Sequence, residues 1–110
     1  MTGVTTSRGY SYGPVRVVLG LDDFNKVQPG DVLVIPFSDV SWSVLFSRAK
    51  AIIAESGGML SHSSILAREY QIPAVVSVSG AMQLIDEMLV TVDGYRGEVI
   101  LHKNAISQAD

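Results

Sequence analysis

Hydrophobic and polar positions alternate in two stretches near the start of the chain, and each stretch predicts a β-strand. In "GPVRVVLG", residues 13–20, apolar side chains alternate with Arg16 and a further valine, which suits a strand covered on both faces. In "QPGDVLVIP", residues 28–36, a Pro-Gly turn precedes a short apolar strand, and Pro36 ends that strand because it has no N–H to donate. We expect these two strands to pair.

Three further stretches have patterns typical of helices. In "SWSVLFSRAK", residues 41–50, apolar side chains at i, i+3, i+4 and i+7 form one buried helical face. Residues 61–70 lack proline and glycine, contain good helix formers, and have Ser61 in position to cap the first turn. Residues 80–88, "GAMQLIDEM", predict a short helix with Met82 and Ile85 directed inward.

The remaining apolar stretches predict strands at 51–55 and 72–78 and a final hairpin at 89–101 that turns around Asp93-Gly94. The order of elements is therefore β, β, α, β, α, β, α, β, β. This alternation predicts an α/β fold. Because the outer strands come as hairpin-like pairs, we expect one mixed sheet or two small sheets, with about three helices.

The length of 110 residues suits one domain with one core. We place that domain at residues 13–102. Residues 1–12, rich in glycine, serine and threonine, are expected to form a loose lead-in, and residues 103–110 a polar tail.

Composition and charge exclude several classes of function. The net charge is −3 and the eight lysines and arginines form no basic stripe, so a nucleic acid partner is not expected. The absence of cysteine excludes disulfides, thiolate nucleophiles and thiolate metal sites. The start of the chain has no signal-peptide pattern, and no apolar run approaches the roughly 20 residues that span a bilayer. We expect a cytoplasmic protein without a membrane partner.

The stretch "ESGGMLSH", residues 55–62, carries the chemistry. A strand ending at Glu55, a Gly57-Gly58 turn and a helix beginning near Ser61 place flexible backbone before a helix N-terminus, where unpaired N–H groups and the helix dipole favour an anion. The glycine spacing fits neither a P-loop nor a dinucleotide-binding fingerprint. His62 stands there instead, and a neutral imidazole is a nucleophile near pH 7. We expect His62 to carry a phosphoryl group.

The same residues resemble a known family. "ESGGMLSHSSILAREYQIPAVV" is similar to the phosphohistidine segment of the phosphoenolpyruvate-utilising enzymes, among them phosphoenolpyruvate synthase, pyruvate phosphate dikinase and rifampicin phosphotransferase. "GPVRVV", "GDVLVIPFSDVSWSVLFSRAKAIIAE" and "VTVDGYRGEVIL" extend the resemblance over residues 9–101. It implies a swivelling β/β/α phosphohistidine domain that shuttles a phosphoryl group between a nucleotide-binding domain and a second active site.

The resemblance assigns the catalytic role to His62. Four residues around it are the candidates for phosphate binding and support: Gly57, Gly58, Ser61 and Ser63. Three positions differ from the family pattern: Leu60 stands where several relatives have threonine, and Ser77 and Glu87 each replace a common glycine.

Nothing in the chain resembles the nucleotide-binding or phosphoenolpyruvate-binding domain of these enzymes. The resemblance therefore implies that this domain binds no cofactor or metal of its own. Mg²⁺ and ATP, or phosphoenolpyruvate, are expected on partner domains in the same or separate chains, together with the acceptor. In the ATP-dependent members the group that reaches the histidine is the β-phosphate.

Several interpretations stay open. Glu55 either orients the imidazole or is an ordinary loop carboxylate. Arg68 lies about 9 Å along the helix from His62 and does not easily reach the same phosphate, so a structural pairing or a partner contact is favoured. His102, in a polar stretch, is expected to be solvated. Whether the chain is part of an enzyme is open: a non-catalytic docking or regulatory module and a small-ligand enzyme with His62 as general base are the alternatives.

Overall fold

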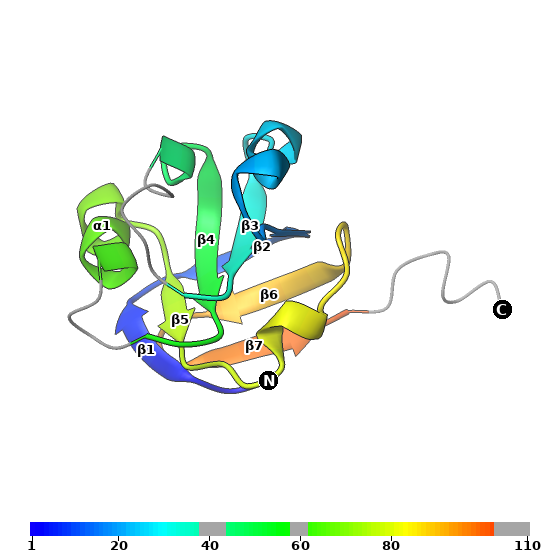
Figure 1. Cartoon of the computed structure of the whole chain (residues 1–110). Helices are drawn as coiled ribbons and strands as arrows, with labels where there is room; N and C mark the ends of the chain where they lie inside the picture. Colours follow the sequence, from blue (N-terminus) through cyan, green and yellow to red (C-terminus); the bar gives the residue numbers. More distant parts are fainter. Residues whose placement is uncertain (38–43, 58–61, 103–110) are drawn as a thin grey trace, which may run out of the picture.

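The computed structural model describes residues 1–37, 44–57 and 62–102, with the side chains of Leu21, His62 and Ser63 left out. In these residues a seven-stranded sheet has the order β1-β5-β4-β3-β2-β6-β7 (Figure 1). The strands are β1 (Val4–Ser7), β2 (Tyr10–Val17), β3 (Asp31–Ile35), β4 (Ala49–Ala54), β5 (Ala74–Val76), β6 (Leu89–Asp93) and β7 (Glu98–Leu101). Helix α1 (His62–Tyr70) connects β4 to β5, and Leu21–Lys26 and Ala81–Gln83 are short 3₁₀ helices.

The sheet is mixed, as expected. Strands β2, β3, β4 and β5 are parallel neighbours, whereas β1 on β5, β6 on β2 and β7 on β6 are antiparallel. The long strand β2 joins the two parts, because residues 10–14 pair with β6 and residues 15–17 pair with β3. The expected pairing of the first two apolar strands and the expected final hairpin are both confirmed.

The central strands are buried on both faces and separate two core clusters. Along β3, Val32 and Val34 face the cluster covered by β6 and β7, whereas Leu33 and Ile35 face the cluster that includes Ala67 of α1. This gives three layers, the β6–β7 hairpin, the parallel strands and α1, which Figure 1 shows in succession. The α/β class and the β/β/α arrangement expected from the sequence are confirmed.

The N-terminal residues correct the expectation of a loose lead-in. Val4–Ser7 form β1 on β5, and Met1 and Gly3 bond to the other end of the sheet: Val99 N–H donates to Met1 O (2.7 Å) and Gly3 N–H to Gly97 O (2.8 Å). The first seven residues thus form the β1 edge of the sheet and also bond to β7 and the turn before it, at the other edge. The sheet is therefore curled towards closure. The polar tail expected at 103–110 lies outside the described residues.

Two of the three expected helices are not α-helices. Residues 44–48 form a short 3₁₀ segment and a turn, and residues 49 and 50 already belong to β4; residues 41–43 lie outside the described part. Within 80–88 only Ala81–Gln83 are helical, and Ile85, expected to point inward, is 69% exposed. Glu87 has a φ of 72°, which a continuing right-handed helix cannot contain.

Candidate functional site

The candidate site lies where the parallel strands end. Strands β3, β4 and β5 point to the same edge of the sheet, visible from their arrowheads in Figure 1. Helix α1 follows β4 and begins at His62. In a β-α-β unit the helix N-terminus lies at the carboxyl edge of the strands, which is where open α/β sheets bind ligands. The expected helix is therefore present, and its first residue is the candidate nucleophile.

Hydrogen bonds join the three segments at this edge. Glu55 N–H donates to Ile35 O (3.0 Å), and Val78 N–H donates to Ala54 O (3.1 Å). Ser56 N–H donates to Pro36 O (3.1 Å), so the ends of β3 and β4 stay together beyond the sheet. These bonds fix the backbone of residues 55 and 56, from which the segment towards His62 begins.

The first glycine of the predicted turn has the backbone that its role requires. Gly57 has a φ of 132°, which residues with a side chain rarely adopt. Its carbonyl oxygen accepts a hydrogen bond from Ser77 Oγ at 2.9 Å. Gly58 and Ser61 lie outside the described residues, as do the side chains of His62 and Ser63.

Glu55 contacts the next segment of chain. Its Oε2 accepts a hydrogen bond from Met82 N–H at 3.0 Å, so the carboxylate holds the 3₁₀ helix Ala81–Gln83 against the end of β4. This contact gives Glu55 a structural task. Its proposed contact with the imidazole stays a prediction.

A polar hollow of about 540 Å³ lies beside the Gly57 turn. It is lined by Glu55, Ser56, Ser77, Ser79, Gly80 and Gln83. Among these residues, only Glu55 is predicted from the sequence to be a site residue. The available signal was the parallel order itself, because the residues after β5 must lie next to those after β4.

Arg68 and His102 lie apart from this edge. Arg68 Nε donates to the carbonyl oxygen of Thr6 on β1 at 2.7 Å, which confirms the structural pairing expected for it. His102 is exposed, as expected, and its Nε2 lies 2.7 Å from the Thr91 hydroxyl.

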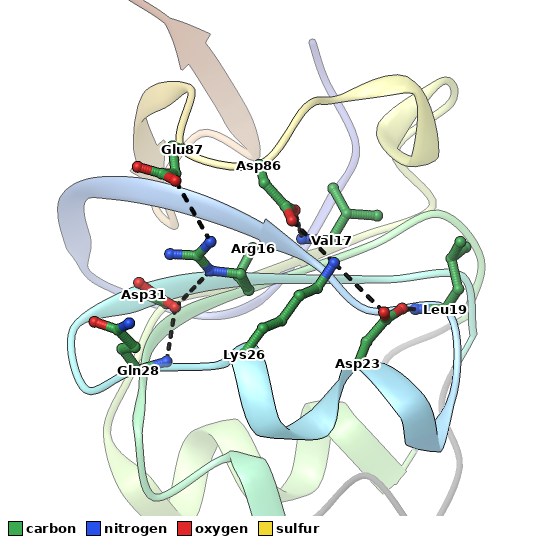
Figure 2. Close-up of polar contacts among 9 residues, drawn as sticks. All are labelled: Arg16, Val17, Leu19, Asp23, Lys26, Gln28, Asp31, Asp86 and Glu87. Atoms are coloured by element: carbon green, nitrogen blue, oxygen red, sulfur yellow. Dashed lines mark hydrogen bonds and ion pairs between the residues drawn. The ribbon is translucent and has the colours of Figure 1, made fainter.

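The best-developed charge network is centred on β2 (Figure 2). Arg16 Nε donates to Asp31 Oδ2 at 2.9 Å, and Lys26 Nζ donates to Asp86 Oδ2 at the same distance. Burial would raise the pKa of Asp86, but the hydrogen bonds from Val17 N–H and Lys26 outweigh it and lower that pKa. The hydrogen bond to Asp86 likewise raises the pKa of Lys26. This network ties β2, β3 and the segment before β6 together, and its role is structural.

No helix in the described part of the chain is both long and apolar enough to cross a bilayer.

Several known proteins are similar to this chain in sequence and in fold. The family model of the phosphoenolpyruvate-utilising enzyme mobile domain matches residues 27–97. An uncharacterised phosphotransferase, YvkC, of Bacillus subtilis is 44% identical over 88% of this chain. A phosphoenolpyruvate synthase of Aeropyrum pernix is 46% identical, also over 88% of this chain.

Both relatives are much longer, and the aligned region is 12% of each. The solution structure of an Enzyme I protein superposes with a TM-score of 0.62 at 27% identity, covering 79% of this chain and 36% of that one. The match of the family model, supported by these alignments, identifies the chain as a member of the mobile-domain family of phosphoenolpyruvate-utilising enzymes.

Proposed function

We propose that the chain is a phosphoryl-carrier domain. In this proposal His62 accepts a phosphoryl group from a nucleotide- or phosphoenolpyruvate-binding partner domain and passes it to an acceptor. The observation that carries the proposal is the position of His62 as the first residue of α1, at the carboxyl edge of the parallel strands of a mobile-domain family member.

The chemistry needs one nucleophile and an anion-stabilising environment. An imidazole nitrogen attacks the phosphorus, a P–N bond forms, and the P–O bond to the donor breaks with its electron pair on the departing oxygen. The acceptor oxygen then attacks, the P–N bond breaks, and the neutral imidazole returns. The phosphoryl charge would sit near the first N–H groups of α1, where the helix dipole places about half a positive charge.

The supporting residues keep the roles predicted for them. Gly57, Gly58, Ser61 and Ser63 are proposed to supply close backbone approach and donors around the phosphoryl group. Glu55 is proposed to orient the imidazole. This role is compatible with its bond to Met82, because a carboxylate has two oxygens and that bond uses one.

The donor and acceptor sites belong to partner domains in this proposal. The chain spans only 12% of the relatives compared, which leaves room in those proteins for separate binding domains. Mg²⁺ and ATP, or phosphoenolpyruvate, would bind there. A cytoplasmic setting, where these donors are available, is part of the same proposal.

Labelling tests the proposal. The purified chain is incubated with extract of its source cells and either ATP labelled in the β-phosphate or labelled phosphoenolpyruvate. We expect acid-labile, base-stable label that His62→Ala abolishes and His102→Ala retains. His102 is a suitable control because it is exposed and lies outside the candidate site. Absence of label with both donors, in extract that labels a relative's histidine domain, would favour the docking-module alternative.

A further inference from the structure

A second, larger hollow lies at the opposite edge of the sheet from His62. Its volume is about 1130 Å³, and it is lined by Thr5, Thr6, Ser7, Arg8, Arg68, Gln71 and Tyr95. Ser7 pairs with Ala74, the first residue of β5, and Gln71 directly follows the last residue of α1. These positions mark the amino edge of the parallel strands. We call this feature the arginine hollow.

The lining of the arginine hollow has a one-sided charge. It contains the guanidinium groups of Arg8 and Arg68, and no acidic side chain among the described residues lines it. In a chain of net charge −3, two of the eight cationic side chains thus converge on one concavity. A guanidinium offers planar, forked donors that match the oxygens of phosphate or carboxylate.

Arg68 is held in place by the floor of the hollow. Its Nε donates to Thr6 O at 2.7 Å, which fixes the guanidinium against β1. At the nearby helix end, Gln71 N–H and Ile72 N–H cap the carbonyls of Arg68 and Ala67.

The hydroxyl of Thr6 is buried beside the hollow without a partner among the described residues. Thr6 is 5% exposed and lines the hollow, and its hydroxyl has no hydrogen-bond partner within the described part of the structure. Buried hydroxyls are normally paired, because an unpaired one forfeits its hydrogen bonds to water. The Oγ1 atom of Thr6 has almost no accessible surface, so the hydroxyl lies beneath the wall of the hollow and not within reach of a ligand in it.

Gln71 has a backbone conformation in which glycine would cost less energy. It occupies the left-handed position after α1 with a φ of 60°, where glycine is favoured. The chain nevertheless has a side chain there, and that side chain lines the hollow. Strained positions of this kind occur at functional sites.

We propose that the arginine hollow binds the oxyanion, a phosphate or a carboxylate, of a small molecule whose apolar part lies against Tyr95. The Tyr95 ring is 58% exposed and so is available for this contact. This binding site is separate from the carboxyl edge. Binding of an oxyanion here therefore does not depend on phosphoryl transfer at His62.

The test follows backbone amide and arginine Nε–H signals by NMR in the full chain carrying His62→Ala, which removes the imidazole at the other edge. Phenyl phosphate, benzoate, inorganic phosphate and phenol are titrated separately, up to about 10 mM. We expect saturable shifts at Thr6, Arg8 and Gln71 with phenyl phosphate or benzoate. Inorganic phosphate should bind more weakly, and phenol should leave these signals unchanged.

Two variants and a control decide the assignment. Arg8→Gln should weaken binding about tenfold, the effect of losing one charge-assisted hydrogen bond, and Arg68→Gln should do the same if it folds. Arg48→Gln, an exposed arginine outside the hollow, should leave affinity unchanged. Equal binding in Arg8→Gln and Arg48→Gln, equal shifts with phenol, or binding of polyglutamate with no binding of either small oxyanion would overturn the proposal.

Discussion

The hydroxyl of Ser77 donates a hydrogen bond to the carbonyl oxygen of Gly57 at 2.9 Å. This bond links the residue after β5 to the glycine turn after β4, the segment that leads towards His62. Ser77 makes it from a left-handed backbone with a φ of 55°, a conformation that suits glycine. A serine at this position therefore combines a backbone cost with a contact at the candidate site.

Substitution of Ser77 separates these two effects. Ser77→Ala keeps the left-handed strain and loses the bond, so it should destabilise the fold by about 1 kcal/mol. Ser77→Gly loses the same bond but relieves about 1 kcal/mol of strain, so its stability should stay close to that of the wild type. Urea unfolding measures both. Equal losses of stability in the two variants would contradict the interpretation of strain.

Substitution of Glu87 measures the cost of a left-handed backbone at a residue whose side chain makes no strong contact. Its φ is 72°, its side chain is 78% exposed, and its carboxylate lies 4.0 Å from Arg16. Glu87→Gly should stabilise the fold by about 1 kcal/mol, because it removes the strain and loses only a long, exposed ion pair with Arg16. Glu87→Gln controls for the charge and should change stability little. Thermal unfolding of the two variants at matched pH gives the comparison, and equal transition temperatures would refute it.

The buried end of the charge network should be the most sensitive to substitution. The side chains of Arg16 and Asp31 are 13% and 4% exposed, so Asp31→Asn leaves a largely buried cation without its partner. We expect a loss of about 3 kcal/mol in the free energy of unfolding. Asp22→Asn, at an exposed position, is the matched control. Restored stability in the double variant Arg16→Met/Asp31→Leu would show that the unpaired Arg16 cation causes the loss. A loss of unfolding free energy in Asp31→Asn no larger than that in Asp22→Asn would exclude this cause.

The Lys26–Asp86 pair predicts a pH dependence. The pKa of Asp86 is lowered, so its contribution is full above the ordinary value of about 3.9 and is lost as pH falls through the lower folded-state pKa. The pKa of Lys26 is raised, so its contribution is full below about 10.4 and is lost as pH rises through the higher folded-state pKa.

Unfolding of the wild type and Lys26→Met across pH measures this dependence. The difference in the free energy of unfolding should be constant between about pH 5 and pH 9 and shrink at both extremes. A difference that stays unchanged as the pH falls through the folded-state pKa of Asp86 would argue against the pair.

Sequence patterns predicted the central strands well because each of them contains a short run of apolar residues. Burial on both faces leaves little ambiguity in a run such as residues 31–35, and prolines and glycines mark the ends. Strand β1 was missed because four mostly polar residues carry no pattern. Its pairing with β5 depends on contacts that are distant in sequence.

The helix expected at 41–50 shows how periodicity can mislead. Leu45 and Phe46, each 2% exposed, fill the core from a turn, and Ala49 is buried as the first residue of β4. Their spacing matches a helical face, yet it comes from two different elements. Short apolar runs give this ambiguity, and only the tertiary structure removes it.

Only those parts of the candidate site that depend on neighbouring residues in the sequence were predicted. The helix that begins at His62 and the glycine before it follow from local signals. The contributions of Ser77, Ser79 and Gln83 come from the segment after β5, which the parallel crossover places beside the end of β4. Sequence order alone does not give this proximity.

Direct mapping of the modification is the best test of whether His62 carries the phosphoryl group. The chain is phosphorylated in extract, digested at alkaline pH to preserve the P–N bond, and fragmented in a mass spectrometer by a method that retains phosphohistidine. We expect the phosphoryl group on His62 and none on His102. Phosphate located on a serine of the same peptide, or on His102, would contradict it.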